Sequence, residues 1–337
     1  MSKQSRHEPA PAAPQATSQA AQAPQPPRQV TYLKAGEGDA GQRIDNFLIR
    51  VLKDAPRTLV YRILRSGEVR VNSGRVGPDY RLQLGDRVRV PPVKLKPRET
   101  TNTPSRSLRE FLAASIIHQD RDLLVVNKPA GVAVHGGSGL AHGVIETFRA
   151  LYPELRELEL AHRLDRDTSG CLLIAKRRAV LRQLHAALRD REMEKRYYAL
   201  VVGRWPYGVK TIDLPLLTNQ KQGGERMVRV HPEGQQAQTT FKPERQFGKL
   251  ATLLDVSLGT GRTHQIRVHA AHAGHPVAGD DKYGDRQRDA LLKPFGLNRM
   301  FLHAHSLTFL HPGSGEPFTV TAPLSPELQE VLERLAK

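Results

Sequence analysis

The sequence predicts an α+β protein with a small N-terminal domain and a larger domain in which helices flank a mixed sheet. First, short apolar runs such as Leu123–Val126 and Leu172–Ala175 have the length of buried strands. Second, amphipathic helical stretches such as Ala179–Arg191 occur among these runs in no regular order, which favours α+β over a regular α/β fold. Third, 337 residues suffice for about two domains of ~150 residues.

Residues 1–30 are predicted to form a disordered tail, and residues 92–115 a linker. The five Gln, seven Ala and six Pro among residues 1–28 bury too little apolar surface to offset the entropy of ordering. The tail lacks the apolar core of a signal peptide, so we expect no targeting function. Four prolines and many charges between Pro91 and Ser115 favour an extended connection.

The small domain is predicted over residues 41–91. Apolar residues repeat at helical spacing in Ile44–Leu52 and again in Leu59–Leu64. Gly67 is a candidate C-terminal cap of the second helix, and the alternation in Val69–Val71 predicts a strand. The larger domain is predicted over 116–337.

Charge points to a polyanionic partner. The chain has 51 Lys and Arg against 34 Asp and Glu, a formal charge of +17, and neutralised phosphates release counterions. RNA, DNA and an anionic membrane surface all fit this charge, as does a basic surface kept for solubility. In the small domain one sign is concentrated on the second helix and the following strand, which favours RNA contact there over a merely solvated face. These residues are Arg57, Arg62, Arg65, Arg70 and Arg75.

Two absences narrow the class of protein further. No stretch approaches the ~18 apolar residues needed to span a bilayer, so we expect no membrane partner. The single cysteine, Cys171, excludes a disulfide within the chain and suits a reducing cytosol. We therefore expect a cytoplasmic protein.

The densest polar segment is His162–Gly170. It places Asp165 and Asp167 among two arginines and a histidine, in a loop before an apolar strand. Catalytic groups concentrate in such scaffold-held loops, although a salt-bridged turn has the same composition. A carboxylate flanked by arginine stays ionised, so one of these acids could serve as a nucleophile.

A second polar segment is Gly259–His269. Thr263 could cap a helix running to Ala273, with Arg262 at its N-terminus and Arg267 in its second turn, where both could reach an anion. The histidines that follow His264 lack metal-ligand spacing, so we expect no zinc.

A glycine-rich turn, His135–Gly139, lacks the Gly-Lys-Ser/Thr ending of a nucleotide P-loop. We interpret it as a turn that lets the backbone approach RNA.

Four ordered motifs carry a resemblance to a known family. They are Lys128–His135, His162–Gly170, Lys195–Gly203 and Gly261–His269. Together they resemble the pseudouridine synthases that modify large-subunit ribosomal RNA, and residues 134–140 most resemble the C branch. The similarity runs from about residue 30 to the C-terminus. Residues 41–72 resemble the small α-L RNA-binding domain first named for a small-subunit ribosomal protein.

The resemblance implies site residues and a reaction. Asp165 matches the family's catalytic aspartate, Tyr197 its active-site tyrosine and Arg267 the arginine paired with that aspartate. The reaction implied isomerises a flipped-out uridine without cofactor or metal. The large-subunit ribosomal RNA is the expected partner, and we expect a monomer. The expected substrate contacts are Arg166, which matches the family's intruding arginine, and His135, Arg262, Arg57, Arg62 and Arg65.

Three other functions fit parts of this pattern. An RNA-binding ribosome-assembly factor without catalysis would not need Asp165, Tyr197 and Arg267. A carboxylate-dependent RNA glycosylase would release free uracil. A metal-dependent nuclease would lose its activity in EDTA, whereas a pseudouridine synthase would not.

Overall fold

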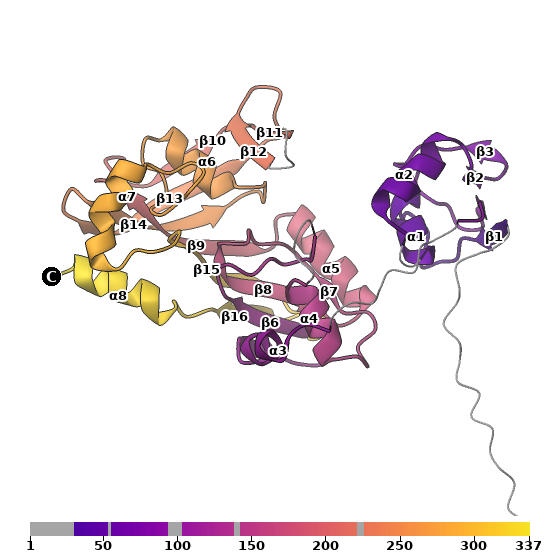
Figure 1. Cartoon of the computed structure of the whole chain (residues 1–337), viewed down its shortest axis with the longest axis horizontal. Helices are drawn as coiled ribbons and strands as arrows, with labels where there is room; N and C mark the ends of the chain where they lie inside the picture. The colour runs from indigo at the N-terminus through magenta and orange to yellow at the C-terminus, as the bar shows by residue number, and fades with distance from the viewer. Residues whose placement is uncertain (1–29, 53–54, 94–102, 138–141, 221–225) are drawn as a thin grey trace, which may run out of the picture. The chain divides into compact units, whose positions relative to one another are not determined.

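The computed structural model describes residues 30–52, 55–93, 103–137, 142–220 and 226–337. The chain divides into two compact units, residues 1–101 and 102–337, which we treat separately (Figure 1). The predicted tail lies outside the described residues except for Val30. None of the helices in the described ranges has the length and apolar character of a membrane span.

The small domain packs two helices against a four-stranded sheet of order β1-β4-β2-β3. Its elements are β1 (Thr31–Lys34), α1 (Ile44–Val51), α2 (Arg57–Arg65), β2 (Arg70–Val71), β3 (Gly74–Arg75) and β4 (Arg87–Val90). Both predicted helices are confirmed, and Gly67 follows the second in the left-handed conformation, at φ 74°. Strand β1 begins before the predicted boundary at 41, and its pairing with β4 makes it part of this domain.

The large domain is built on a mixed sheet, as predicted. Among the described residues the sheet has ten strands in the main order β10-β13-β14-β9-β15-β8-β6-β5, with β7 beside β8 and β16 beside β15. The pairing of β15 with β8 is parallel, whereas the other pairings are antiparallel. The strands of this sheet are β5 (Ile116–Gln119), β6 (Leu123–Lys128), β7 (Glu159–Leu160), β8 (Ser169–Ala175), β9 (Glu194–Val202), β10 (Lys210–Asp213), β13 (Gln238–Phe247), β14 (Ala251–Leu258), β15 (Leu302–Leu310) and β16 (Pro317–Thr321). A separate two-stranded sheet pairs β11 (Leu216–Gln220) with β12 (Arg226–Val230).

Helices cover both faces of this sheet, because apolar side chains alternate along its central strands. On β9, Tyr197 and Ala199 join the core under α3, α4 and α6, whereas Leu200 and Val202 join the core under α7 and α8. Helix α5 covers the second face beside β8. The helices are α3 (Arg106–Ala113), α4 (Val144–Leu151), α5 (Arg178–Arg189), α6 (Gln265–His272), α7 (Arg286–Leu292) and α8 (Pro326–Leu335), with a 3₁₀ turn, η1 (Lys293–Phe295).

The sequence predicts a linker over residues 92–115, but α3 lies inside it. The Ser105 hydroxyl accepts the Leu108 amide at 3.2 Å and caps the helix, and Leu112 is fully buried. The prolines that favour a linker end at Pro104, and the helix that follows has too few apolar residues for periodicity to predict it. Residues 94–102 of the predicted linker lie outside the described residues.

Gly170 joins the polar loop His162–Gly170 to strand β8. Its φ is 111°, and a Cβ atom there would lie 2.2 Å from the Ala304 carbonyl oxygen. Only glycine tolerates both conditions. The loop therefore joins β8 at the point where Gly170 pairs with Ala304 of β15.

Candidate active site

A cavity of about 90 Å³ lies in the large domain where this loop meets the N-terminus of α6. It draws on the loop before β8, on β9, on the β14–α6 connection and on β15. The residues that line it are Arg163, Leu164, Asp165, Thr168, Tyr197, Leu258, Gly261, Arg262, Thr263, His264, Gln265, Ile266, Arg267 and Leu302. The structure thus brings together Asp165, Tyr197, Arg262 and Arg267.

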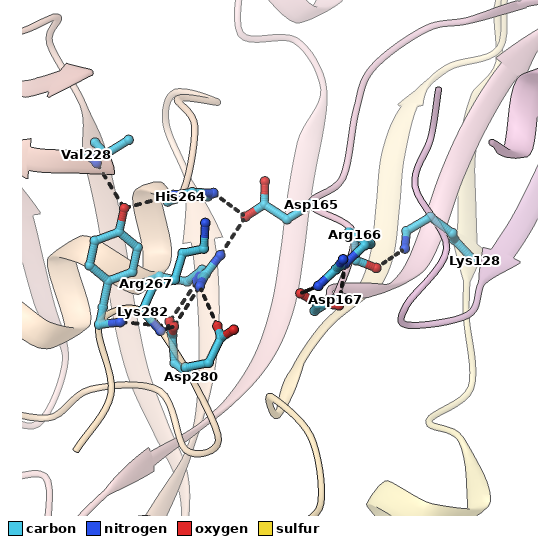
Figure 2. Close-up of polar contacts among 11 residues, drawn as sticks. Lys128, Asp165, Arg166, Asp167, Val228, His264, Arg267, Asp280 and Lys282 are labelled. Carbon is cyan, nitrogen blue, oxygen red and sulfur yellow. Dashed lines mark hydrogen bonds and ion pairs between the residues drawn. The ribbon is translucent and has the colours of Figure 1, made fainter. Parts of the chain in front are cut away.

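A buried lysine supports the loop that carries Asp165. Lys128 is fully buried, and its Nζ donates to the carbonyl oxygens of Pro129 and Val132, each at 2.9 Å. It also donates to the carbonyl oxygen of Arg166 at 2.9 Å (Figure 2). Burial lowers the pKa of Lys128 to about 7, against the opposing effect of nearby carboxylates. Three carbonyls need the three protons of an ammonium group, so the charged form fits this site. Lys128 thus fixes the backbone one residue after Asp165.

Arg267 faces Asp165 but is held by another carboxylate. Its Nη1 lies 3.5 Å from Asp165 Oδ2, whereas its Nε and Nη2 donate to the two oxygens of Asp280 at 2.7 and 2.6 Å (Figure 2). Arg267 is 4% exposed and the Asp280 side chain 0%. The bidentate pair with Asp280 is therefore the principal interaction, and the predicted pair with Asp165 is the longer of the two.

Backbone amides of the turn Gly279–Gly284 hold the Asp280 carboxylate that binds Arg267. Asp280 Oδ1 also accepts the amides of Lys282 and Tyr283, at 3.0 and 3.1 Å. Burial alone would raise the pKa of Asp280, but Arg267 and these amides lower it below its usual value. Asp280 stays ionised, so it fixes a guanidinium whose free nitrogen points at Asp165.

Tyr197 closes another side of the cavity. It lies on β9, is 7% exposed and belongs to the core under α6. Burial, and then the charge of Asp165, raise the pKa of its phenol. The hydroxyl therefore stays protonated, and the ring offers a flat apolar surface beside the carboxylate.

The chain is similar to known proteins in both of its domains. Residues 122–272 match the RNA pseudouridylate synthase family, and residues 42–88 match the S4 domain. Ribosomal large subunit pseudouridine synthase C of Escherichia coli (strain K12) is 54% identical over 300 residues, which cover 88% of this chain and 94% of that protein. The protein of the same name from Pasteurella multocida (strain Pm70) is 51% identical over 307 residues, which cover 91% and 94%.

The chain belongs to the RNA pseudouridylate synthase family. A solved structure of similar fold, human RNA pseudouridylate synthase domain containing 4, is 27% identical with a TM-score of 0.57. It covers 68% of this chain and 96% of its own. The predicted family, the α+β fold and the enzyme class are confirmed.

The N-terminus of α6 in this synthase differs from the prediction. Thr263 does not cap the helix; the N-cap residue is His264, in the left-handed conformation at φ 53°. No side chain caps the helix; the Gln265 side chain instead accepts the Arg262 amide, which precedes the helix, at 3.0 Å. Periodicity places the helix but cannot reveal a left-handed residue, so His264 was not expected in the site.

Two other expected RNA contacts of the synthase lie outside the cavity. The Arg166 side chain is 58% exposed and pairs with Asp167 at 3.1 Å, while Arg163 of the same loop lines the cavity. His135 is exposed. The Gly136 amide in the glycine-rich turn donates to Glu146 at 2.9 Å, so it is not free for a phosphate. Residues 138–141 of that turn lie outside the described residues.

The small domain of the synthase presents arginines on two surfaces. Arg62 and Arg65 are exposed on α2, and the Arg57 side chain lies outside the described residues. A groove on the sheet side was not expected as a unit. Its lining includes Tyr32, Arg70, Arg75, Arg87 and Arg89.

Within the described residues, one group of side chains could hold a metal ion: His118, Asp120 and His311. Both imidazole Nε2 atoms lie within 2.8 Å of Asp120 Oδ2. His311 Nδ1 accepts the amides of Gly313 and Ser314, at 3.1 and 3.3 Å, which leaves its proton on Nε2. A metal bound at Nε2 would displace that proton, and a proton moved to Nδ1 would break both amide contacts. These three residues therefore fit a hydrogen-bonded cluster better than a metal site.

Proposed function

We propose that this synthase isomerises uridines to pseudouridines in large-subunit ribosomal RNA, with Asp165 as its nucleophile. The observation that carries the proposal is the Asp165 carboxylate in a cavity beside an arginine fixed by Asp280. The relatives from E. coli and P. multocida are named ribosomal large subunit pseudouridine synthase C, which supports the choice of RNA. The formal charge of +17 is consistent with that partner.

The target uridine would have to leave its stack, because a glycosidic bond inside a stacked strand cannot reach Asp165. Flipping costs a few kcal/mol, and less in an RNA loop than in a duplex. Tyr197 would pack on the flipped base. Arg267 would orient Asp165, so that a carboxylate oxygen attacks either the sugar carbon C1′ or the ring carbon C6.

Binding and chemistry would be divided between the two units. The small domain, 41–91 with β1 added, would anchor RNA through its arginines, and 116–337 would hold the reaction. Such a monomer would work in the cytoplasm, where ribosomal RNA is assembled, and would need neither metal nor cofactor. Arg262, on the rim of the cavity, would contact the RNA strand that enters it.

Pseudouridine mapping of ribosomal RNA tests this proposal. Cells lacking the gene should lose specific large-subunit pseudouridines, and the wild-type gene should restore them whereas Asp165→Asn should not. The purified enzyme should isomerise the same uridines in transcribed RNA with EDTA present. Free uracil in that reaction would indicate a glycosylase. RNA binding without any isomerisation would indicate an assembly factor.

A further inference from the structure

His264 is the one described residue of the cavity whose backbone carries left-handed strain. Among non-glycine residues in the described ranges, positive φ angles occur at Asn72, Ser73, Arg191 and His264, and only the last lines the cavity. The left-handed conformation is unfavourable for a residue with a Cβ atom, because that atom crowds the following carbonyl oxygen. Such strain persists where surrounding contacts over-determine it, and it clusters at functional sites.

A chain of hydrogen bonds fixes the imidazole. The Val228 amide donates to the Tyr283 phenol oxygen at 2.9 Å, and this oxygen lies 2.8 Å from His264 Nδ1 (Figure 2). An amide can only donate, so the phenol accepts from Val228 and its own proton is free to go to His264 Nδ1. That assignment leaves the ring proton on Nε2.

The other ring nitrogen supports the same tautomer. His264 Nε2 lies 3.8 Å from Asp165 Oδ2. An ionised carboxylate only accepts, so a bare Nε2 lone pair facing it would be repelled, whereas an Nε2–H is attracted. At 3.8 Å the separation is too long for a hydrogen bond, so the donor is not saturated by Asp165.

The imidazole is also held neutral. The side chain is 11% exposed, and burial lowers its pKa. The charged groups around it act in both directions: Asp165 and Asp280 favour the cation, while Arg267 and Lys282 oppose it. A cation here would pair with Asp165 and weaken the nucleophile, so a neutral N–H donor suits this position better.

We propose that His264 is a catalytic residue whose neutral Nε2–H donates a hydrogen bond to a carbonyl oxygen of the flipped uracil. The inference rests on the proposed function. If Asp165 attacks C1′, the N1–C1′ bond breaks, its electron pair stays with N1, and the negative charge spreads onto O2 and O4. If Asp165 adds to C6 instead, the C5=C6 electron pair shifts to form a C4=C5 bond, and the C4=O4 pair moves onto O4 as an enolate. On both routes negative charge develops on a carbonyl oxygen of the base, where a preorganised donor acts most strongly.

Three variants separate catalysis from folding. His264→Gly removes the donor and also relieves the left-handed strain, so it should fold. Its kcat should fall about 10²–10³-fold, as for removal of one oxyanion donor, with KM nearly unchanged. His264→Gln, which keeps an N–H donor, should recover part of that activity. Tyr283→Phe should lower kcat less than His264→Gly. It removes the hydroxyl that fixes the proton on His264 Nε2, but it keeps the imidazole itself.

Thio-substituted RNA gives a readout that a structural role would not move. Sulfur accepts hydrogen bonds poorly, so 2-thio- or 4-thiouridine at the target should slow the wild type. The same substitution should slow His264→Gly by a smaller factor. Equal thio effects in both proteins, or kcat of His264→Gly within threefold of wild type, would overturn the proposal.

Nitrogen-15 NMR of the free enzyme tests the tautomer without any RNA. Wild type should show a protonated Nε2 and a bare Nδ1 at pH 7, and Tyr283→Phe a mixture. A protonated Nδ1 in the wild type would refute the assignment even if the enzyme is active. An enzyme with the expected tautomer that isomerises no uridine would refute the proposed function instead.

Discussion

Two helices of the synthase use arginine in opposite ways. On α6, Arg267 is 4% exposed and binds Asp280 through two hydrogen bonds. On α2, Arg62 and Arg65 are exposed, and Arg65 donates only to the Tyr61 carbonyl oxygen among the described residues. A buried pair is costly to break, whereas exposed charges are screened and contribute little to folding. The first arrangement fixes a guanidinium beside Asp165, and the second leaves positive charge exposed to solvent.

The largest effect should come from the centre itself. Asp165→Asn keeps the shape of the side chain but removes the charge that attacks, so turnover should fall about 10⁴-fold or more. Single-turnover pseudouridine formation measures this. Asp167→Asn is the matched control, because that carboxylate pairs with the exposed Arg166, and it should stay within a few-fold of wild type. If Asp165→Asn retains near-normal turnover, this carboxylate has no part in the chemistry.

The buried pair gives the next effect. Arg267→Ala leaves Asp280 fully buried without its cation, which should cost about 3–5 kcal/mol of unfolding free energy. The matched exposed change, Arg62→Ala, should stay within about 0.5 kcal/mol. Thermal unfolding without RNA measures both.

Double-mutant cycles sharpen this result. The coupling of Arg267 with Asp280 should exceed its coupling with Asp165, because the distances are 2.6 and 3.5 Å. Equal couplings would mean that Asp165 supports Arg267 as strongly as Asp280 does.

These two sites also show what sequence can and cannot predict. Helices α1, α2 and α5 follow from apolar periodicity, which is local. Asp165, Tyr197 and Arg267 follow from motifs that resemble a family. The pairing of Arg267 with Asp280 could not be predicted from the sequence. A turn brings the Asp280 carboxylate back to α6, and nothing in the segment Gly279–Gly284 identifies Arg267 as its partner. The left-handed backbone of His264 is equally invisible in composition or spacing.

Acid should destabilise the large domain but not the small one. Burial lowers the pKa of His162 and of His303 to about 4, from an ordinary 6.5. Between pH 6.5 and 4 these histidines are protonated in the unfolded chain but neutral in the folded protein. The folding stability of the large domain, fully present above pH 6.5, is therefore lost as the pH falls toward 4. Each histidine contributes at most about 1.4 kcal/mol per pH unit. The small domain, 31–93, has no histidine and should keep its stability in this window.

Each domain has its own probe. Trp205 is the only tryptophan and is buried in the large domain, so its fluorescence follows that domain alone. Amide hydrogen exchange follows the small one. His162→Gln can still accept the Leu173 amide and should reduce the pH slope by about one proton. Equal acid sensitivity of the two domains would contradict the assignment.

The smallest effect per residue should come from the exposed arginines. Removing one arginine that binds a phosphate lowers the slope of log affinity against log salt by about 0.7–0.9. Replacing Arg62 and Arg65 with Gln should therefore flatten the slope by up to roughly twice that amount. Arg334→Gln is the control, because this arginine pairs with Glu330 on α8, away from the cavity face.

Saturating RNA then distinguishes an anchor from a catalytic part. If α2 only holds the substrate, the Arg62/Arg65 variant should raise KM and leave kcat unchanged, since bound RNA meets an intact cavity. An unchanged salt slope would remove α2 from the RNA surface. A flattened slope on replacing Arg87 and Arg89 instead would place RNA in the groove beside Tyr32, where Arg87 already stacks 4.2 Å from the ring centre. The contrast between the two helices holds only if substitutions in α2 change RNA affinity but not kcat, and substitutions at α6 change kcat but not affinity.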